Sequence, residues 1–192
     1  MGSGNKICTV LLISYNHEKY IRTCLESIIS QKTTFKFELI VGDDASTDQT
    51  AKVILEYAAL YPDIVIPVIR EKNIGAVANL VELLKIARGK YIAGCEGDDY
   101  WTNSNKLELQ FKFLEEKEDY IACSHDIEIV NEDGTLADKQ YLTWISPARD
   151  YSLKDYKGIL LPGHPVALVF RNIFREEEDP GVLLDFHTLI AD

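Results

Sequence analysis

Three carboxylates stand within four residues in the stretch AGCEGDDYW, residues 93–101. Glu96, Asp98 and Asp99 repel one another, and burying such charges without a partner is costly. The first lysine or arginine that follows them is Lys106, so the local sequence offers little positive charge. Carboxylate oxygens suit Mg²⁺ or Mn²⁺, and Mg²⁺ usually binds through one or two carboxylates while water or phosphate fills the other positions. Either solvent or a divalent cation therefore completes this acidic cluster.

Gly97 lies inside the acidic cluster and would let the backbone turn sharply or approach a ligand closely. The alternative interpretation is a solvated acidic turn before a helix, for which Ser104 is the expected N-cap. The cluster directly follows an apolar run of strand length, and a second pair of acids, Asp43 and Asp44, follows another such run. This shared position at strand ends favours ligand binding over the solvated turn.

The second pair of acids belongs to the stretch DDASTD, residues 43–48. One of its carboxylates could accept a hydrogen bond from the N–H of a uracil or from ribose hydroxyls. Ser46 is a good N-cap, and Gln49 three residues later is its expected capping-box partner. In the alternative interpretation all the polar residues here, Asp48 included, are helix caps and turn formers.

Apolar runs and amphipathic patterns alternate over the first two-thirds of the chain. The runs predict buried strands at 7–14, 37–42, 64–69 and 90–95. Three-and-four spacing of apolar residues predicts helices at 15–31, 46–61 and 75–88, the last closed by Gly89, and another after Ser104. Pro67 cannot donate to a strand ladder, which places the third strand near an edge. This order is typical of an α/β fold with a parallel sheet and right-handed crossovers.

Ligands of such sheets bind beyond the carboxyl ends of the strands. Three of the four predicted strands end in polar groups, namely Ser14-Tyr15-Asn16, Asp43-Asp44 and the acidic cluster. Because the strands are parallel, we expect these groups to lie on the same rim of the sheet. The functional prediction depends on that convergence, since scattered acids would mean little.

The pattern changes after residue 119. Partial alternation ends the stretch 120–130, and NEDG at 131–134 is typical of a hairpin turn. A further strand is predicted at 166–170, and 182–192 reads as the beginning of a helix that the sequence does not finish.

Composition narrows the functional classes. A net charge of −11 argues against a nucleic-acid-binding surface and against docking on anionic lipid, while 46% hydrophobic residues can build a substantial core. The four cysteines lack C-x-x-C spacing, which indicates reduced thiols in a cytosolic protein. No apolar run approaches the length of a membrane span. We expect a cytoplasmic protein, or one that is peripheral at the inner face of the membrane.

Four stretches taken together resemble the family 2 glycosyltransferases of GT-A fold: VLLISYNHEKYIRTCLESIISQ, ELIVGDDASTDQT, NIGAVANLVELLKIARGKYIAGCEGDDYW and KLELQFKFLEE. Any one of them is a weak signal, but their order and spacing hold over about residues 7–120. The resemblance implies a Rossmann-like, mostly parallel sheet flanked by helices in a single domain over 1–192. We expect a nucleotide-binding half at about 7–120 and a smaller mixed or antiparallel acceptor half at about 121–192, truncated at its C-terminus.

The resemblance also implies which residues contact the nucleotide. The first strand-end loop lies against the nucleotide, an acid after the second strand reads uracil and ribose, and an N-x-G segment lies beside them. The matching residues here are Ser14, Tyr15 and Asn16, then Asp44 with Asp43 as its less certain neighbour, then Asn73 and Gly75. Arg70 or Lys72 could offer charge to the diphosphate.

Glu96-Gly97-Asp98 matches the D-x-D metal motif of the family, with Asp98 as the expected direct ligand of Mn²⁺ or Mg²⁺. The first aspartate of that motif is a glutamate here, one methylene longer. Direct ligation, a water-mediated contact and a ribose contact are therefore all open for Glu96. Asp99 is a second metal contact or positions the acceptor, and His164 is a diphosphate or metal contact or a plain loop histidine.

The catalytic base of the family is a carboxylate on a later segment, near the start of a helix. Asp185 is the matching candidate, and Glu178 and Asp179 are its rivals. Asp126 and Glu128, which alternate on a predicted strand, stay open as well. A helix-start acid favoured by the helix dipole is the structural alternative for Asp185. Tyr100 and Trp101, which follow the acidic cluster, are assigned to the acceptor pocket, and core packing is the favoured alternative for Trp101.

The expected function is transfer of a sugar, with inversion, from a nucleotide-diphosphate sugar (UDP-linked) to an acceptor hydroxyl in polysaccharide or cell-surface glycan synthesis. The acceptor would be a glycan, a lipid-linked molecule or a protein. The alternatives are a metal-dependent nucleotide-sugar-binding module without transferase activity and a metal-dependent phosphatase. Such a phosphatase would carry D-x-D-x-T after its first strand, where this chain has Ser14-Tyr15-Asn16. A dinucleotide site and a P-loop are disfavoured because their glycine motifs are missing.

Overall fold

The computed structural model describes residues 8–137, 150 and 164–175. The predicted strands of the first two-thirds are present as β1 (Cys8–Ser14), β2 (Phe37–Asp43), β3 (Val65–Ile69) and β4 (Tyr91–Glu96). The predicted helices are present as α1 (Ile21–Ile29), α2 (Thr50–Leu60), α3 (Ala76–Ile86) and α4 (Lys106–Glu116). Strand and helix alternate along the chain as predicted.

The strands form a six-stranded sheet in the order β3-β2-β1-β4-β6-β5. The first four strands run parallel, and β3 lies at an edge, as Pro67 indicated. β6 (Val169–Arg171) pairs antiparallel with β4 and with β5 (Ala122–Cys123). The predicted mostly parallel sheet with an antiparallel part from the later sequence is therefore confirmed.

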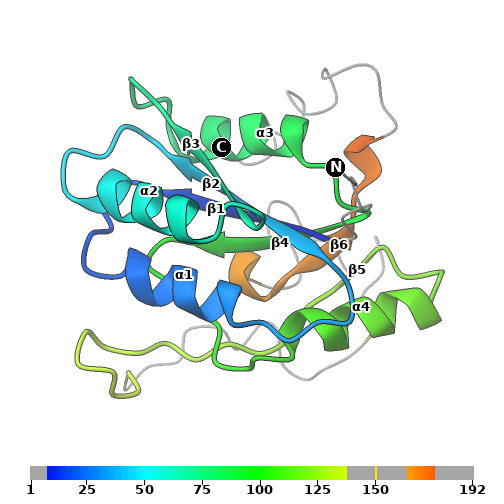
Figure 1. Cartoon of the computed structure of the whole chain (residues 1–192). Coiled ribbons are helices and arrows are strands. Elements are labelled where there is room, and N and C mark those ends of the chain that lie inside the picture. The colour runs from blue at the N-terminus through cyan, green and yellow to red at the C-terminus, as the bar shows by residue number, and fades with distance from the viewer. Residues whose placement is uncertain (1–7, 138–149, 151–163, 176–192) are drawn as a thin grey trace.

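Helices cover both faces of the sheet (Figure 1), with α1, α2 and α4 on one face and α3 on the other. Alternation along β1 explains this arrangement, because successive side chains of a strand point to opposite faces. Val10 and Leu12 pack into the core under α1 and α2, while Leu11 packs into the core under α3. Apolar residues on both faces of the strand produce the continuous apolar run seen in the sequence.

The predicted cap of α2 is wrong. The helix begins at Thr50, and Gln49 occupies its N-cap position without a side-chain hydrogen bond. Ser46 Oγ instead donates to Asp43 Oδ1 at 2.5 Å. The polar residues after β2 therefore build a loop before the helix starts.

Two further caps also differ from prediction. α4 has Asn105 rather than Ser104 at its N-cap position, and α3 ends before Gly89 can serve as its C′ residue. Gly89 is instead a packing glycine, because a Cβ atom there would overlap the backbone of Thr9. Close contact between the α3–β4 connection and β1 explains the glycine.

The hairpin turn at NEDG is present. Asn131 N–H donates to Thr135 O at 2.8 Å, Gly134 has φ 81°, and Val130 bridges Leu136. One prediction for the later sequence needs correction here. The strand predicted at 166–170 is divided into a 3-10 turn, η1 (Pro165–Ala167), and the short β6. A second 3-10 turn, η2 (Ile173–Arg175), follows, and the helix predicted at 182–192 lies outside the described residues.

The four cysteines are free thiols, and Cys8, Cys24 and Cys95 are buried, as the sequence indicated. Burial raises the pKa of the Cys8 thiol to about 12. Within the described residues, no helix has both the length and the apolar character needed to cross a membrane.

Candidate functional site

The two groups of acids lie on the same rim, on either side of β1. In the parallel registers Ser14 of β1 pairs with Asp43 of β2, and Ile13 pairs with Glu96 of β4. The backbone continues both pairings beyond the strands, because Asp44 N–H donates to Ser14 O and Gly97 N–H donates to Ile13 O, each at 2.9 Å. The predicted convergence of strand ends is therefore present in the structure.

Asp43 and Asp44 are both buried, and each carboxylate is already engaged by the protein. Asp43 accepts from the backbone N–H and the hydroxyl of Ser46, at 3.0 and 2.5 Å. Asp44 accepts from the backbone N–H groups of Ile74 and Gly75, both at 2.8 Å. Asp44 therefore fixes the N-x-G segment to the end of β2, and its oxygens retain further lone pairs for a ligand.

The loop after β1 is tied to the loop after β2. Asn16 has φ 57°, in the left-handed region that asparagine tolerates better than most residues. Its side-chain oxygen accepts from Thr47 N–H at 2.8 Å, and its own N–H donates to Ser46 Oγ at 2.9 Å. Tyr15 beside it is exposed. These contacts bring the predicted nucleotide-binding residues of β1 and β2 together on one rim.

The N-x-G segment and Arg70 complete this side of the rim. Gly75 has φ 89°, a conformation that favours glycine, and its N–H also lies 3.2 Å from Asn73 Oδ1. Arg70 follows β3, and its Nε donates to Asn79 Oδ1 at 2.9 Å. One terminal nitrogen of Arg70 is buried and has no hydrogen-bond partner within the described part of the chain.

The acids after β4 contrast with those after β2. Oδ2 of Asp99 is buried and has no hydrogen-bond partner among the residues that the structure describes. Burial raises the pKa of the Glu96 carboxyl, and the negative charge of Asp99 adds to that effect. Burial likewise raises the pKa of the Asp99 carboxyl, and the charge of Asp98 adds to it while His164 opposes it. The protein thus leaves this cluster short of positive charge.

Two histidines flank the cluster. His17 Nε2 lies 3.9 Å from Asp98 Oδ2, and His164 Nδ1 lies 3.9 Å from Asp99 Oδ2. His164 Nδ1 accepts from Val166 N–H at 3.4 Å, which places the proton of a neutral His164 ring on Nε2. A buried Asp99 oxygen with no hydrogen-bond partner among the described residues, beside two further carboxylates, is an arrangement that a cation would satisfy. The donor set therefore fits a divalent cation.

The sequence prediction did not include His17. This histidine follows Ser14-Tyr15-Asn16 directly, so its place in a strand-end loop was the available signal. What the sequence could not show is the path of the chain, which turns His17 back towards the end of β4.

Gly97 packs closely against the loop after β1, while the close approach to a ligand predicted for it stays a prediction. A Cβ atom on Gly97 would lie 2.6 Å from Ser14 Oγ and 2.6 Å from His17 Nδ1. Any side chain at this position would therefore separate the end of β4 from the loop after β1.

Trp101 packs in the core, as its sequence context favoured. Its indole Nε1–H donates to Val166 O at 3.0 Å, which ties the turn that follows His164 to the segment after the acidic cluster. Lys106 Nζ lies 4.1 Å from the centroid of the Trp101 ring and is buried without a hydrogen-bond partner among described residues. Tyr100, by contrast, is exposed.

Among the described residues, no three histidine, cysteine, aspartate or glutamate side chains converge closely enough to hold a metal ion by themselves. Binding of Mn²⁺ or Mg²⁺ at the acidic cluster therefore stays a prediction, in which substrate phosphates complete the coordination.

None of the candidates for the catalytic base is shown to lie beside the acidic cluster. Asp185, Glu178 and Asp179 lie outside the described ranges. Asp126 and Glu128 are described, but they are exposed and lie outside any strand, which corrects the strand predicted for them.

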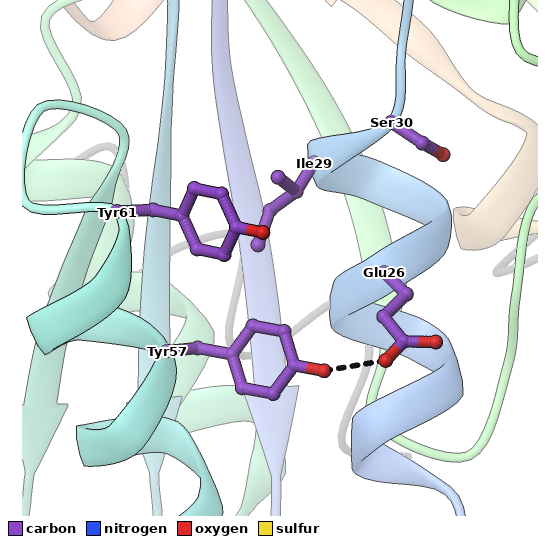
Figure 2. Close-up of a pocket in the computed structure, with 5 residues that line it drawn as sticks. All are labelled: Glu26, Ile29, Ser30, Tyr57 and Tyr61. Atoms are coloured by element: carbon purple, nitrogen blue, oxygen red, sulfur yellow. Dashed lines mark hydrogen bonds between the residues drawn. The ribbon is translucent and has the colours of Figure 1, made fainter.

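A groove of about 500 Å³ lies between α1 and α2 (Figure 2), where Tyr57 donates to Glu26 at 2.6 Å. Its lining also includes Ile29, Ser30 and Tyr61. These residues belong to the C-terminal halves of helices that lead back from the carboxyl ends of the strands. The groove is therefore separate from the acidic rim.

Comparison with curated proteins gives relatives that are longer than this chain. The uncharacterised protein Rv1520 of Mycobacterium tuberculosis (strain H37Rv) is 47% identical over 126 residues, which is 66% of this chain and 36% of that protein. EpsE of Bacillus subtilis (strain 168), described as a candidate glycosyltransferase, is 37% identical over 134 residues, 70% of this chain and 47% of EpsE. The chain thus spans less than half the length of these two relatives.

Two solved structures are similar. Residues 1–349 of Staphylococcus aureus TarS in complex with UDP match with a TM-score of 0.67 and 25% identity, over 86% of this chain and 47% of that one. The Pyrobaculum calidifontis mannosyltransferase PcManGT, in complex with GDP-Man and Mn²⁺, matches with a TM-score of 0.57 and 26% identity, over 65% and 36%. The likeness to TarS confirms the predicted GT-A fold.

The family model described as "Glycosyl transferase family 2" matches residues 9–177. That range holds β1, β2 and β4, whose ends form the rim, and continues through β6. The chain belongs to glycosyl transferase family 2.

Proposed function

We propose that this chain carries the donor-binding part of an enzyme that transfers a sugar, with inversion, from a UDP-linked sugar to an acceptor hydroxyl. The product would be a polysaccharide or another cell-surface glycan, and the acceptor a glycan, a lipid-linked molecule or a protein. The enzyme would act in the cytoplasm or at the inner face of the membrane.

One observation carries the proposal. Two groups of acids flank the end of β1 on a single rim, and one group is held by hydrogen bonds from the protein while the other contains a buried oxygen without a partner among the described residues. A nucleotide diphosphate needs both properties, because its nucleoside requires a fixed polar surface and its phosphates require positive charge. Asp44 with the loop after β1 offers the first, and the acidic cluster with a bound cation offers the second.

Asp98 is the direct ligand in this proposal, with Glu96, Asp99 and His164 as further contacts to Mn²⁺ or Mg²⁺ or to the diphosphate. A cation bound there would stabilise the charge that develops on the departing diphosphate. Oδ2 of Asp99, buried without a partner among the described residues, supports the assignment of this acid. The two flanking histidines would limit how far the carboxylates can move apart.

The nucleoside would lie over the loops after β1 and β2, against Ser14, Tyr15 and Asn16. Asp44, with Asp43 as its neighbour, would accept from the base or the ribose while it holds Ile74 and Gly75 in place beside Asn73. Arg70 has an unpartnered buried nitrogen among the described residues, which supports a role towards the diphosphate.

Asp185 is the proposed base, because the family resemblance places a carboxylate near the start of a late helix. The base would remove the proton of the acceptor hydroxyl from the side opposite the departing diphosphate, which produces inversion. In this proposal Asp185→Asn spares donor binding and removes transfer. Unchanged transfer by that variant would move the role to Glu178 or Asp179.

The neighbours support the choice of ligands. The TarS structure holds UDP, and the PcManGT structure holds Mn²⁺ with a sugar nucleotide. TarS is similar to this chain over 86% of its length and PcManGT over 65%.

The test is a calorimetric titration of UDP into the protein with and without Mn²⁺, followed by assays of sugar release and transfer from UDP-sugars. We expect UDP binding that requires Mn²⁺. Metal-dependent binding without transfer, also in a chain extended to the length of the relatives, would favour a binding module. Release of inorganic phosphate from phosphomonoesters would favour the phosphatase, and no response to UDP would overturn the donor assignment.

A further inference from the structure

His17 is held in place from three directions although it lies in a loop. Its backbone N–H donates to Thr50 Oγ1 at 2.8 Å, and its carbonyl accepts from Tyr20 and Ile21 at the start of α1. Its ring Nδ1 lies 3.3 Å from Ser14 Oγ. These contacts leave Nε2 as the ring atom that faces the acidic cluster.

The buried hydroxyl of Ser14 determines which ring nitrogen of His17 carries the proton. Ser14 is 3% exposed, and His17 Nδ1 is the hydrogen-bond partner found for its hydroxyl among the described residues. A buried hydroxyl that donates to nothing is unfavourable, so the hydroxyl donates to Nδ1. Neutral histidine then carries its proton on Nε2, and His17 presents an N–H group to Asp98.

His17 and His164 therefore differ in what they present to the cluster. His164 Nδ1 is occupied by the backbone N–H of Val166, whereas His17 presents a hydrogen-bond donor to Asp98. The gap from His17 Nε2 to Asp98 Oδ2 is 3.9 Å, about 1 Å beyond a hydrogen bond. The Asp98 side chain is 49% exposed, so it has room to rotate and close that gap.

We infer that His17 is a positioning residue for the metal-binding carboxylate, through the relay Ser14 Oγ–H to His17 Nδ1 and His17 Nε2–H to Asp98 Oδ2. The inference rests on the proposed function, which makes Asp98 a metal ligand. With one oxygen of Asp98 held by His17, the other oxygen keeps a single direction towards the cation. Partners of this kind in metal sites typically change metal affinity about 10- to 100-fold when they are removed.

Gly97 supports the same relay. Its missing side chain lets Ser14 Oγ and His17 Nδ1 both lie against the backbone that immediately precedes Asp98. The donor and the carboxylate are thus set side by side by the backbone itself, although they are 81 positions apart in sequence.

The experiment compares two substitutions that each keep one ring position of the histidine. Asparagine can place its amide near Nδ1, whereas glutamine can place an N–H near Nε2. Mn²⁺ affinity is measured on the 192-residue chain with saturating UDP and no acceptor, from the electron paramagnetic resonance signal of free Mn²⁺. This readout requires no turnover, and melting temperatures show whether each variant folds.

We expect His17→Asn to weaken Mn²⁺ binding about 10- to 100-fold and His17→Gln to stay within about 3-fold of the unaltered chain. Ser14→Ala should weaken Mn²⁺ binding less than His17→Asn, because it removes only the hydroxyl that fixes the proton of His17 on Nε2. His125→Asn, at a histidine on a separate segment that contacts Asp126 O, is the matched control and should change nothing.

Equal Mn²⁺ affinity in His17→Asn and the unaltered chain would overturn the inference and leave the proposed function standing. Equal losses in His17→Asn and His17→Gln would also overturn it, because they would indicate a packing role. If the unaltered chain binds no Mn²⁺ with UDP present, the proposed function fails, and this inference fails with it.

Discussion

The acids at the ends of β2 and β4 lie on one rim but have opposite surroundings. Asp43 and Asp44 are buried and accept hydrogen bonds from the following loop and from the N-x-G segment. Asp98 and Asp99 face histidines at 3.9 Å, and one oxygen of Asp99 lacks a partner among described residues. The first pair holds the loops of the rim together, while the second pair has little positive charge around it within the described residues.

Position at a strand end therefore does not by itself define a ligand site. A carboxylate saturated by backbone N–H groups stabilises the fold whether or not a ligand is present. A carboxylate left without donors raises the free energy of the empty site, and a cation removes that penalty. The predictions below separate these two roles.

The largest effect is expected from Asp44→Ala. Its carboxylate is buried and accepts two backbone hydrogen bonds at 2.8 Å, so the substitution leaves two N–H groups unpaired. We expect a loss of about 4 kcal/mol in the free energy of unfolding, since hydrogen bonds to charged groups contribute about 1.5 to 3 kcal/mol each. Urea denaturation measures it. Asp44→Asn, which keeps one acceptor, should lose roughly half as much, and equal losses would contradict the assignment.

Asp98→Ala should change stability little and metal-dependent UDP binding strongly. The side chain is half exposed and makes no hydrogen bond in the described structure, so the free energy of unfolding should change by less than about 0.5 kcal/mol. Metal-dependent UDP binding should weaken by about 100-fold or more, since the direct ligand is lost. Calorimetry with and without Mn²⁺ tests this. Retained metal-dependent affinity would remove Asp98 from the site.

Lys106→Met tests whether the first lysine after the acidic cluster supplies charge to the acids. Burial lowers the pKa of Lys106 to about 8, and the nitrogen lies over Trp101 rather than against a carboxylate. A pKa shift of that size lowers the free energy of unfolding by about 3 kcal/mol at pH 7, and the cation–π contact with Trp101 offsets part of this loss. We therefore expect the substitution to stabilise the protein by about 1 to 2 kcal/mol at pH 7.

The stability difference between the unaltered protein and Lys106→Met should change with pH in one direction. Between pH 8 and 10.5 the unfolded chain still binds the Lys106 proton while the folded chain has released it. The stability of the unaltered protein therefore rises through this window relative to Lys106→Met. Denaturation of both proteins at pH 7 and pH 10 measures the difference. Destabilisation by Lys106→Met at pH 7 would indicate that the lysine does compensate the acids.

Glu96→Gln should have the smallest effect and the opposite sign to Asp44→Asn. Burial and the neighbouring Asp99 raise the pKa of the Glu96 carboxyl, so removal of its charge relieves a penalty. We expect the metal-free protein to gain about 0.5 kcal/mol, measured by urea denaturation with a chelator present. Destabilisation of the same size as in Asp44→Asn would erase the distinction between the two groups of acids.

Particular residues show which features of the fold could be predicted from the sequence. The strand and helix order of residues 8–116 could be predicted because buried parallel strands are continuous apolar runs and their helices are amphipathic. The helix caps could not, since Ser46 and Gly89 are committed to contacts with the β2 acid and the β1 backbone that local sequence does not reveal. Asp126 and Glu128 alternate like a strand but have no neighbouring strand to pair with among the described residues.

The sequence alone determined that three strands end in polar groups and that the chain resembles family 2 glycosyltransferases. The period of apolar residues carries that information locally, within each element. The tertiary contacts show that Asp44 accepts two backbone hydrogen bonds, that one oxygen of Asp99 has no partner among the described residues, and that His17 turns towards Asp98. Those facts depend on contacts between segments about 30 to 80 residues apart, and such contacts leave no periodic trace in the chain.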